Sequence, residues 1–461
     1  MIDKSVLDTI TDGKFRTLCE EVVNEMNRLS IPGAAVGILF EEKEFVAPFG
    51  ITNLEHPLPV TEDTLFQIGS ISKTYLATAI MRLVEMGKLE LNQPIREYLR
   101  ELKLSDESVA SRVTMRHLLT HTGGWVGDYF DDFGMGEDAL ARMIAKMADL
   151  QQLTPLGEIW SYNNSGFYLA GRVVEVLTGH SFEAAIKELV LDPLELNMSF
   201  FFSQDVITHR FTVGHTVVDK QHQVARPWAI GRAIHPAGGI VCTVKDLLHY
   251  ARFHMGDGNS SNGTRVLSRE SLELMQTPMF PSTGISMIGL SWGITPVDGT
   301  KLVGHTGGTN GQIALLRMAP AEKFAVAILT NSDEGQALIL EIANSATKQY
   351  IGIALPDALP LDLPEEKLLP YVGKYDAAAE ECEIYLREEV FFLQVTPKIG
   401  FPTPDSPPPP TPPPFRVALY AEDRLIVLDE PLKGIRGEFL RNSDNRIAWL
   451  RLGGRVHARL G

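Results

Sequence analysis

The chain of 461 residues has few cysteines, and they stand far apart. Cys19, Cys242 and Cys382 fit neither a disulfide framework nor a zinc motif, so we expect buried free thiols. The first residues of the sequence carry no signal-peptide pattern. Together these two absences predict a cytoplasmic protein.

Long apolar runs and a positive charge excess are also missing. No segment reaches the ~18 apolar residues that a membrane-spanning helix needs. The formal net charge is −16, which would repel both nucleic acid and an anionic membrane surface. We therefore expect no nucleic-acid partner and no membrane partner.

The common motifs of cofactor and metal enzymes are absent too. The sequence contains no Gly-x-Gly-x-x-Gly, no Gly-x₄-Gly-Lys-(Ser/Thr) and no His-Glu-x-x-His stretch. His215, His222 and His235 have no metal-ligand spacing. No Gly-x-Ser-x-Gly surrounds Ser70, which argues against the nucleophile elbow of a typical α/β-hydrolase. We expect no cofactor and no metal.

What the sequence does contain predicts an α+β domain over residues 1–352. An amphipathic helix is expected at 15–30 and another helix at 335–350. Two hairpins are predicted, and the residues between them, about 70–277, are mostly helical in pattern. Strands from both ends of this region imply one antiparallel sheet, with the helical middle as a second lobe. The four hairpin strands are expected at 34–40, 45–49, 313–318 and 324–330.

The composition changes after this domain. Residues 353–368 are rich in proline and read as a linker, whereas 369–461 hold short strands separated by turns. The pattern predicts a small antiparallel β-barrel. Its strands are expected at 383–386, 390–395, 415–420, 424–428, 435–440, 447–452 and 456–460.

The proline run 402–414 is either a ligand for proline-binding modules or, as we favour, a stiff extended loop between strands.

A serine and a lysine three residues apart are the most informative pair. The residues after Ser70 repeat with helical spacing up to Gly87, so Ser70 and Lys73 share one face at a helix start. A desolvated lysine can take the proton of a serine hydroxyl, and helix-start N–H groups favour an oxyanion. The pair predicts a nucleophile with its base.

Two further motifs follow in order: Tyr162-x-Asn164, and His305-Thr306-Gly307 before an apolar strand. With Ser70-x-x-Lys73 they resemble the penicillin-recognising serine hydrolases, which include class C β-lactamases, DD-peptidases, D-aminopeptidases and β-lactamase-like esterases. The tyrosine makes the class C-like branch the nearest, and a C-terminal lipocalin-like barrel occurs in some members. Accessory runs at 66–69, 117–124 and 238–240 support the resemblance.

The resemblance implies roles for these residues. Ser70 is the nucleophile, and Lys73 and Tyr162 move its proton, with the choice of base left open. The N–H groups of Ser70 and Gly308 form the oxyanion hole.

The remaining motif residues are expected to bind substrate or to shape the cleft. Asn164, Thr306 and Gly307 contact substrate, and the Asn164 amide also orients Lys73. The earlier His-Thr-Gly-Gly at 121–124 is assigned to structure at the cleft edge.

His305 stands where β-lactamases have lysine. It is expected to act in catalysis, as a proton relay or as a cation that changes charge near pH 6.5, about the unperturbed histidine value. A histidine there is a weaker carboxylate anchor than lysine, so efficient β-lactam hydrolysis is not expected.

The sequence thus predicts a serine hydrolase that forms an acyl-enzyme with small-molecule esters, amides or peptides, D-residue substrates included. An acyltransferase with the same residues is one alternative, and a non-catalytic ligand-binding sensor is another. A homo-oligomer is compatible with the sequence.

Overall fold

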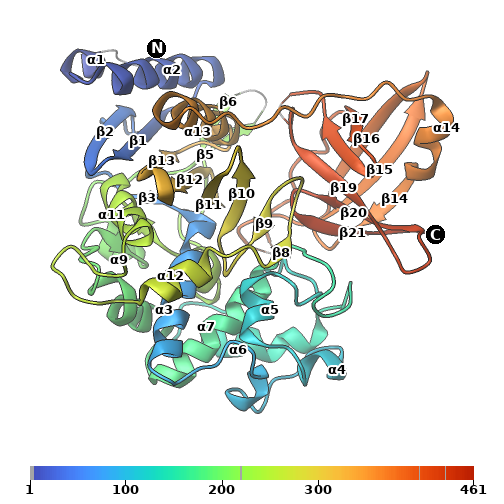
Figure 1. The fold of residues 1–461 in the computed structure, drawn as a ribbon, viewed down its shortest axis with the longest axis horizontal. Helices are drawn as coiled ribbons and strands as arrows, with labels where there is room; N and C mark the ends of the chain where they lie inside the picture. The colour runs from blue at the N-terminus through green and yellow to red at the C-terminus, as the bar shows by residue number, and fades with distance from the viewer. Residues whose placement is uncertain (1–4, 219–220, 404, 431, 461) are drawn as a thin grey trace.

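An eight-stranded antiparallel sheet joins the two ends of the first 350 residues in the computed structural model, which describes residues 5–218, 221–403, 405–430 and 432–460 (Figure 1). Its strand order is β2-β1-β13-β12-β11-β10-β9-β8. The expected sheet is confirmed, with four further strands, β8 to β11, that the sequence did not predict. The strands are β1 Gly33–Phe40, β2 Lys43–Gly50, β8 Phe280–Pro281, β9 Met287–Ile288, β10 Gly293–Val297, β11 Thr300–Thr309, β12 Gln312–Ala319 and β13 Phe324–Thr330.

Both faces of this sheet are buried. Val36 and Ile38 of β1 pack under the helices α2 (Gly13–Leu29) and α13 (Gly335–Ile351), whereas the alternate residues Ala35 and Leu39 face the helical lobe. The apolar stripe predicted for the first helix is buried here. The sheet is thus the middle layer of this domain.

The second lobe is mostly helical, as expected, and lies against the other face of the sheet (Figure 1). Its central helix α3 ends before Gly87, whose φ of 68° suits glycine. The short helix α1 (Ser5–Thr9) lies beside α2 instead. The other helices of this domain are α3 Ser72–Glu85, α4 Glu107–Ala110, α5 Met115–Leu119, α6 Ala139–Lys146, α7 Asn164–Thr178, α8 Phe182–Ile186, α9 Ser203–Val206, α10 His235–Gly238, α11 Val244–Met255 and α12 Arg269–Met275. Short strands accompany them: β3 Phe66–Gln67, β4 Ser199–Phe200, β5 His215–Val218, β6 Gln221–Val224 and β7 Val241–Cys242.

The C-terminal part closes into an eight-stranded antiparallel barrel, which confirms that prediction. Its first strand was not predicted, because only Tyr375 of its four residues is buried in the barrel core. Within the expected linker, residues 365–368 form the short helix α14 (Glu365–Leu368) instead of irregular chain. The strands are β14 Gly373–Asp376, β15 Glu380–Arg387, β16 Val390–Pro397, β17 Phe415–Ala421, β18 Arg424–Val427, β19 Arg436–Arg441, β20 Ile447–Leu452 and β21 Arg455–Arg459.

The proline run lies between β16 and β17, apart from Pro404, which is outside the described residues. Next to the start of this run, the ring of Phe401 packs edge-on against Phe130 of the helical lobe, with 5.1 Å between ring centroids. This loop therefore contacts the lobe that carries the second motif.

Among the described helices, none combines the length and the apolar character needed to cross a membrane.

Candidate active site

Ser70 lies in a 3-10 turn, Gly69–Ile71, that leads directly into α3. Lys73 occupies the first turn of that helix, and its Nζ is 2.9 Å from Ser70 Oγ. The i, i+3 spacing brings the two side chains to one face, as the sequence predicted. Ser70 remains half-buried at a cavity wall, open to an incoming carbonyl.

The environment of Lys73 suits a neutral amine. Its side chain is 0% exposed, and Nζ donates to the carbonyl oxygen of Ala237 at 2.7 Å. Burial, followed by the charge of Arg455, holds the pKa of Lys73 well below its usual value, although Asp128 opposes this.

The sequence assigned the orientation of Lys73 to Asn164. The structure gives this task to Ala237, because the Asn164 amide donates instead to Asp128 Oδ1 at 2.8 Å. The Ala237 carbonyl is a backbone group far from Lys73 in the sequence, so the Ser70-x-x-Lys73 motif could not indicate it.

Tyr162 lies just before α7, whose N-cap is Asn163. Its ring centroid is 4.9 Å from Lys73 Nζ. Burial raises the pKa of Tyr162 to about 12, against the opposing effects of a hydrogen bond with Ser70 and the charge of Arg455. The phenol is therefore protonated at neutral pH.

The third motif lies in strand β11, which the sequence did not predict, and directly precedes the apolar strand β12, as the sequence predicted. A Cβ on Gly307 would come within 1.9 Å of the Ile68 oxygen and 2.8 Å of Ser70 N, so only glycine fits this packing. A Cβ on Gly69 would likewise come within 2.6 Å of Gly308 N. The two backbones that carry the expected oxyanion donors are thus adjacent.

His305 is half-buried in β11, and its Nδ1 contacts the carbonyl oxygen of Thr306. Burial and the charge of Lys73 lower the pKa of His305 to about 4. The predicted change of charge near pH 6.5 is therefore wrong. His305 is therefore neutral at neutral pH, chiefly because burial disfavours the charged ring, and any positive charge on Lys73 disfavours it further.

A cavity of about 890 Å³ connects these motifs. Ser70, Tyr162, Asn164 and His305 line it, as do Thr306, Gly307 and Gly308. Thr306 and Gly308 are exposed in the cavity, whereas Gly307 is largely covered by the turn that carries Ser70. The barrel also lines this cavity, through Pro397, Ile399, Gly400, Phe401, Pro409 and the β20–β21 turn.

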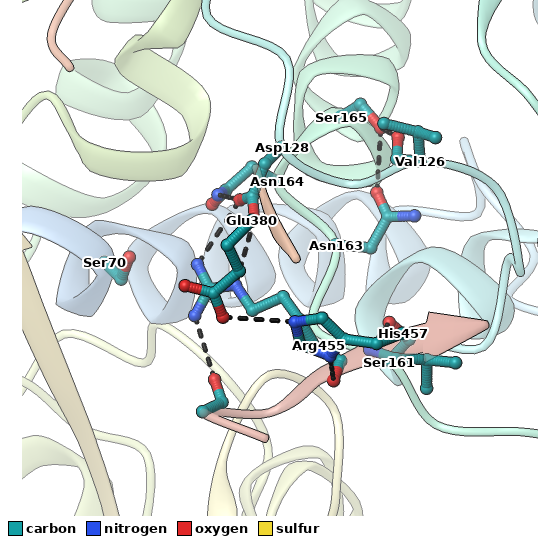
Figure 2. Close-up of polar contacts among 12 residues, drawn as sticks. Ser70, Val126, Asp128, Ser161, Asn163, Asn164, Ser165, Glu380, Arg455 and His457 are labelled. Carbon is teal, nitrogen blue, oxygen red and sulfur yellow. Dashed lines mark hydrogen bonds and ion pairs between the residues drawn. The ribbon is translucent and has the colours of Figure 1, made fainter. Parts of the chain in front are cut away.

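Arg455 is a site residue that the sequence did not predict. It begins β21 in the barrel, and its guanidinium carbon is 4.7 Å from the Tyr162 ring centroid. The same group pairs with Asp128, at 3.1 Å from Nε to Oδ2 (Figure 2). In the sequence, the feature nearest to Arg455 was the turn Gly453-Gly454. This turn indicated a strand boundary and gave no indication of a functional residue.

His121 also lies closer to the chemistry than predicted. Instead of shaping only the cleft edge, its ring stacks on Tyr162 at 4.5 Å between centroids. Its Nδ1 accepts from the backbone N–H of Asn163 at 2.9 Å. The repeated His-Thr-Gly-Gly was the available signal, but the sequence could not place it behind the tyrosine.

The sequence profile of the Beta-lactamase family matches residues 20–345, which contain all three motifs. This chain belongs to that family. The family and the fold expected from the motifs are thereby confirmed, and the family is one of β-lactamase-fold serine hydrolases.

One relative is penicillin-binding protein 4 of Amycolatopsis lactamdurans, which is 32% identical over 358 residues, or 75% of this chain and 93% of that protein. The crystal structure of SurE resembles the whole chain, barrel included, with a TM-score of 0.75 at 23% identity over 97% of this chain and 99% of SurE. SurE has also been crystallised with D-Leu. An octameric penicillin-binding protein homologue from Pyrococcus abyssi has a TM-score of 0.63 at 24% identity, over 96% of this chain and 99% of that one.

Proposed function

We propose that this protein is a serine hydrolase that forms an acyl-enzyme on Ser70. The observation that carries the proposal is the 2.9 Å contact between Ser70 Oγ and the fully buried amine of Lys73. Burying a lysine beside a hydroxyl costs stability, and a protein that only binds ligand gains nothing from the pair. Groups perturbed in this way cluster at functional sites.

In the acylation step neutral Lys73 takes the proton of Ser70 while Oγ attacks the substrate carbonyl carbon. Negative charge then develops on the carbonyl oxygen. The N–H groups of Ser70 and Gly308 would stabilise it, since their backbones lie side by side next to the nucleophile. Ala237 keeps the amine in place by accepting a second hydrogen bond.

Tyr162 would serve as the general acid. Because its pKa is raised to about 12, it holds a proton that can pass to the leaving oxygen or nitrogen as the bond to the carbonyl carbon breaks. Lys73 then carries the serine proton and passes it to the deprotonated Tyr162 beside it, which restores both the neutral amine and the phenol. In deacylation, water attacks the acyl carbon and gives one proton to Lys73. Lys73 passes this proton to Ser70 Oγ as the acyl–oxygen bond breaks, so the free acid leaves and the Ser70 hydroxyl is regenerated.

The substrates are proposed to be esters, amides or peptides, D-residue substrates included. A neutral His305 favours uncharged groups beside β11, which argues against β-lactams with their carboxylate. The D-Leu complex of SurE supports a D-amino acid unit in the substrate.

Acyl transfer to an amine is a second candidate, and the barrel wall of the cleft favours it. Phe401, Pro409 and Gly454 of the barrel line the same cavity as Ser70, so the two domains enclose it together. Such a cleft can exclude water from the acyl-enzyme and hold a second substrate.

The test is a panel of p-nitrophenyl esters, D- and L-aminoacyl p-nitroanilides and nitrocefin, measured with the parent enzyme and Ser70→Ala. We expect turnover of esters or D-aminoacyl compounds, little of nitrocefin, and none with the variant. Ser111→Ala is a matched control at an exposed serine. Turnover that survives Ser70→Ala contradicts the mechanism.

Adding D-leucine methyl ester as an amine acceptor separates the two candidates. A hydrolase releases the free acid, whereas an acyltransferase yields the coupled amide, which mass spectrometry distinguishes.

The octameric homologue also supports a homo-oligomer, and light scattering of the purified chain tests this. The cytoplasmic location remains a prediction for cell fractionation.

A further inference from the structure

Three side chains with metal-binding atoms meet in the barrel, and none of them belongs to the catalytic motifs. Glu380 and Cys382 are alternate residues of β15 and point to the same side, and His457 belongs to β21. One ligand atom from each lies within 4.8 Å of the others. Strand β14 pairs with both β15 and β21 and therefore lies between them, but it ends at Asp376. Beyond that end, the side chains of Glu380 on β15 and His457 on β21 can contact each other.

The hydrogen bonds of His457 define which ring nitrogen is free. Its Nδ1 is 3.2 Å from the Leu450 carbonyl oxygen and 3.1 Å from that of Arg455, so Nδ1 carries the proton. Nε2 then presents its lone pair to Glu380 Oε1 at 3.1 Å (Figure 2). Nε2 and Oε1 would both be hydrogen-bond acceptors, so their contact at this distance requires a positive centre between them. That centre is either a second proton on the His457 ring or a metal ion.

Cys382 favours the metal ion. Its thiol is 0% exposed, and within the described part of the chain no hydrogen bond engages its sulfur. An ion pair between the Glu380 carboxylate and a protonated His457 would not be stabilised by the Cys382 thiol beside it. A thiolate, an imidazole and a carboxylate together form a ligand set that suits zinc and does not suit magnesium or calcium.

We propose that Glu380, Cys382 and His457 bind one Zn²⁺ ion through Oε, Sγ and Nε2. Zinc with three protein ligands keeps a fourth position for water. A cavity of about 340 Å³, lined by Glu380 and His457 together with Tyr162 and Asp128, gives the ion and its water a way in. On binding, the Cys382 thiol loses its proton to solvent as the sulfur–zinc bond forms.

The ion would also fix a wall of the catalytic cleft. Coordination of Nε2 strengthens the hydrogen bond that His457 Nδ1 donates to the Arg455 carbonyl. Arg455 is the residue whose guanidinium covers Tyr162, so zinc would hold the β20–β21 hairpin in the position that the site needs.

The experiment uses the full chain, stripped with EDTA and kept reduced, and titrates it with Co²⁺ as a visible substitute for Zn²⁺. We expect a thiolate-to-cobalt charge-transfer band that saturates at one equivalent and disappears when Zn²⁺ is added. Cys382→Ser should abolish this band, and His457→Gln should weaken cobalt binding at least ~10-fold. Cys242→Ser, a buried free cysteine in the catalytic lobe, is the matched control and should keep the band.

The proposal is overturned by the absence of a band in the parent protein or by an unchanged band in Cys382→Ser. If circular dichroism shows that Cys382→Ser does not fold, Glu380→Gln replaces it, since this half-buried side chain lies at the edge of the barrel. Unchanged cobalt affinity in Glu380→Gln then also rejects the site. These readouts are spectroscopic and do not depend on the proposed hydrolase activity.

Discussion

The guanidinium carbon of Arg455 lies 4.7 Å from the centroid of the Tyr162 ring, and the backbone N–H of Tyr162 donates to the carbonyl of Gly454 at 2.8 Å. The C-terminal barrel therefore contributes both a cation and a backbone anchor to the catalytic tyrosine that we propose. Because Arg455 also lowers the pKa of Lys73, the barrel influences both proton-transfer groups.

Replacing Arg455 should shift the pH dependence of the enzyme. Without this cation the pKa of Lys73 rises, because Arg455 lowers it and Asp128 raises it. Arg455→Gln should therefore move the rising limb of kcat/KM to higher pH and reduce the rate at neutral pH by on the order of 10-fold. Arg387→Gln removes an arginine that lies 5.0 Å from an aromatic ring elsewhere on the barrel, and it should leave the profile unchanged.

The parent profile itself tests the assignment of Lys73 as the base. Activity requires the neutral amine, so kcat/KM should increase with pH through a lysine pKa well below the usual value of 10.5. It should decline only at strongly alkaline pH, as Tyr162 loses its proton near its pKa of about 12. A profile that rises only around the usual lysine value would exclude Lys73 as a base with a lowered pKa.

Tyr162→Phe should retain the fold and lose most activity. The substitution removes one hydroxyl and leaves the stacking on His121 in place. Loss of a general acid typically costs ~10²–10⁴-fold in rate. Steady-state kinetics and a melting temperature measure the two effects. Tyr129→Phe, a tyrosine that does not line the cleft with Ser70, provides the comparison, and a loss of only a few-fold in Tyr162→Phe would argue against proton transfer by this residue.

His305 should not act as a pH switch. Since its pKa is about 4, the ratio of kcat/KM for a carboxylate-bearing substrate to that for a neutral one should stay constant from about pH 5 to 8. His305→Lys installs a cation and should raise this ratio on the order of 10-fold. His249→Lys adds the same charge at an exposed surface position and should not. An inflection of the ratio near the usual histidine value would show that the ring titrates there after all.

Phe401 should affect substrate binding more than chemistry. Its ring lines the cleft and packs on Phe130 at 5.1 Å, so Phe401→Ser should raise KM for apolar substrates roughly 3–10-fold with little change in kcat. Phe392→Ser removes a ring that stacks on Tyr385 outside the cleft and serves as the control. Equal KM values for the two variants would mean that the proline loop does not contact substrate.

Much of this protein follows from short-range sequence patterns. The pair Ser70 and Lys73 is readable because positions i and i+3 share a helix face, and the amphipathic stripe of α2 is readable because helical periodicity is local. The barrel follows from alternating strands and turns, although β14, with one buried residue, gave too little signal.

The tertiary structure decided what depends on distant residues. Ala237 takes the role expected of Asn164, and Arg455 reaches Tyr162, only because separate segments pack together. The same holds for His305, whose pKa falls to about 4 because the fold buries it beside Lys73. Desolvation and charge–charge interaction act through space, so their strength is set by packing distances that a residue pattern does not contain.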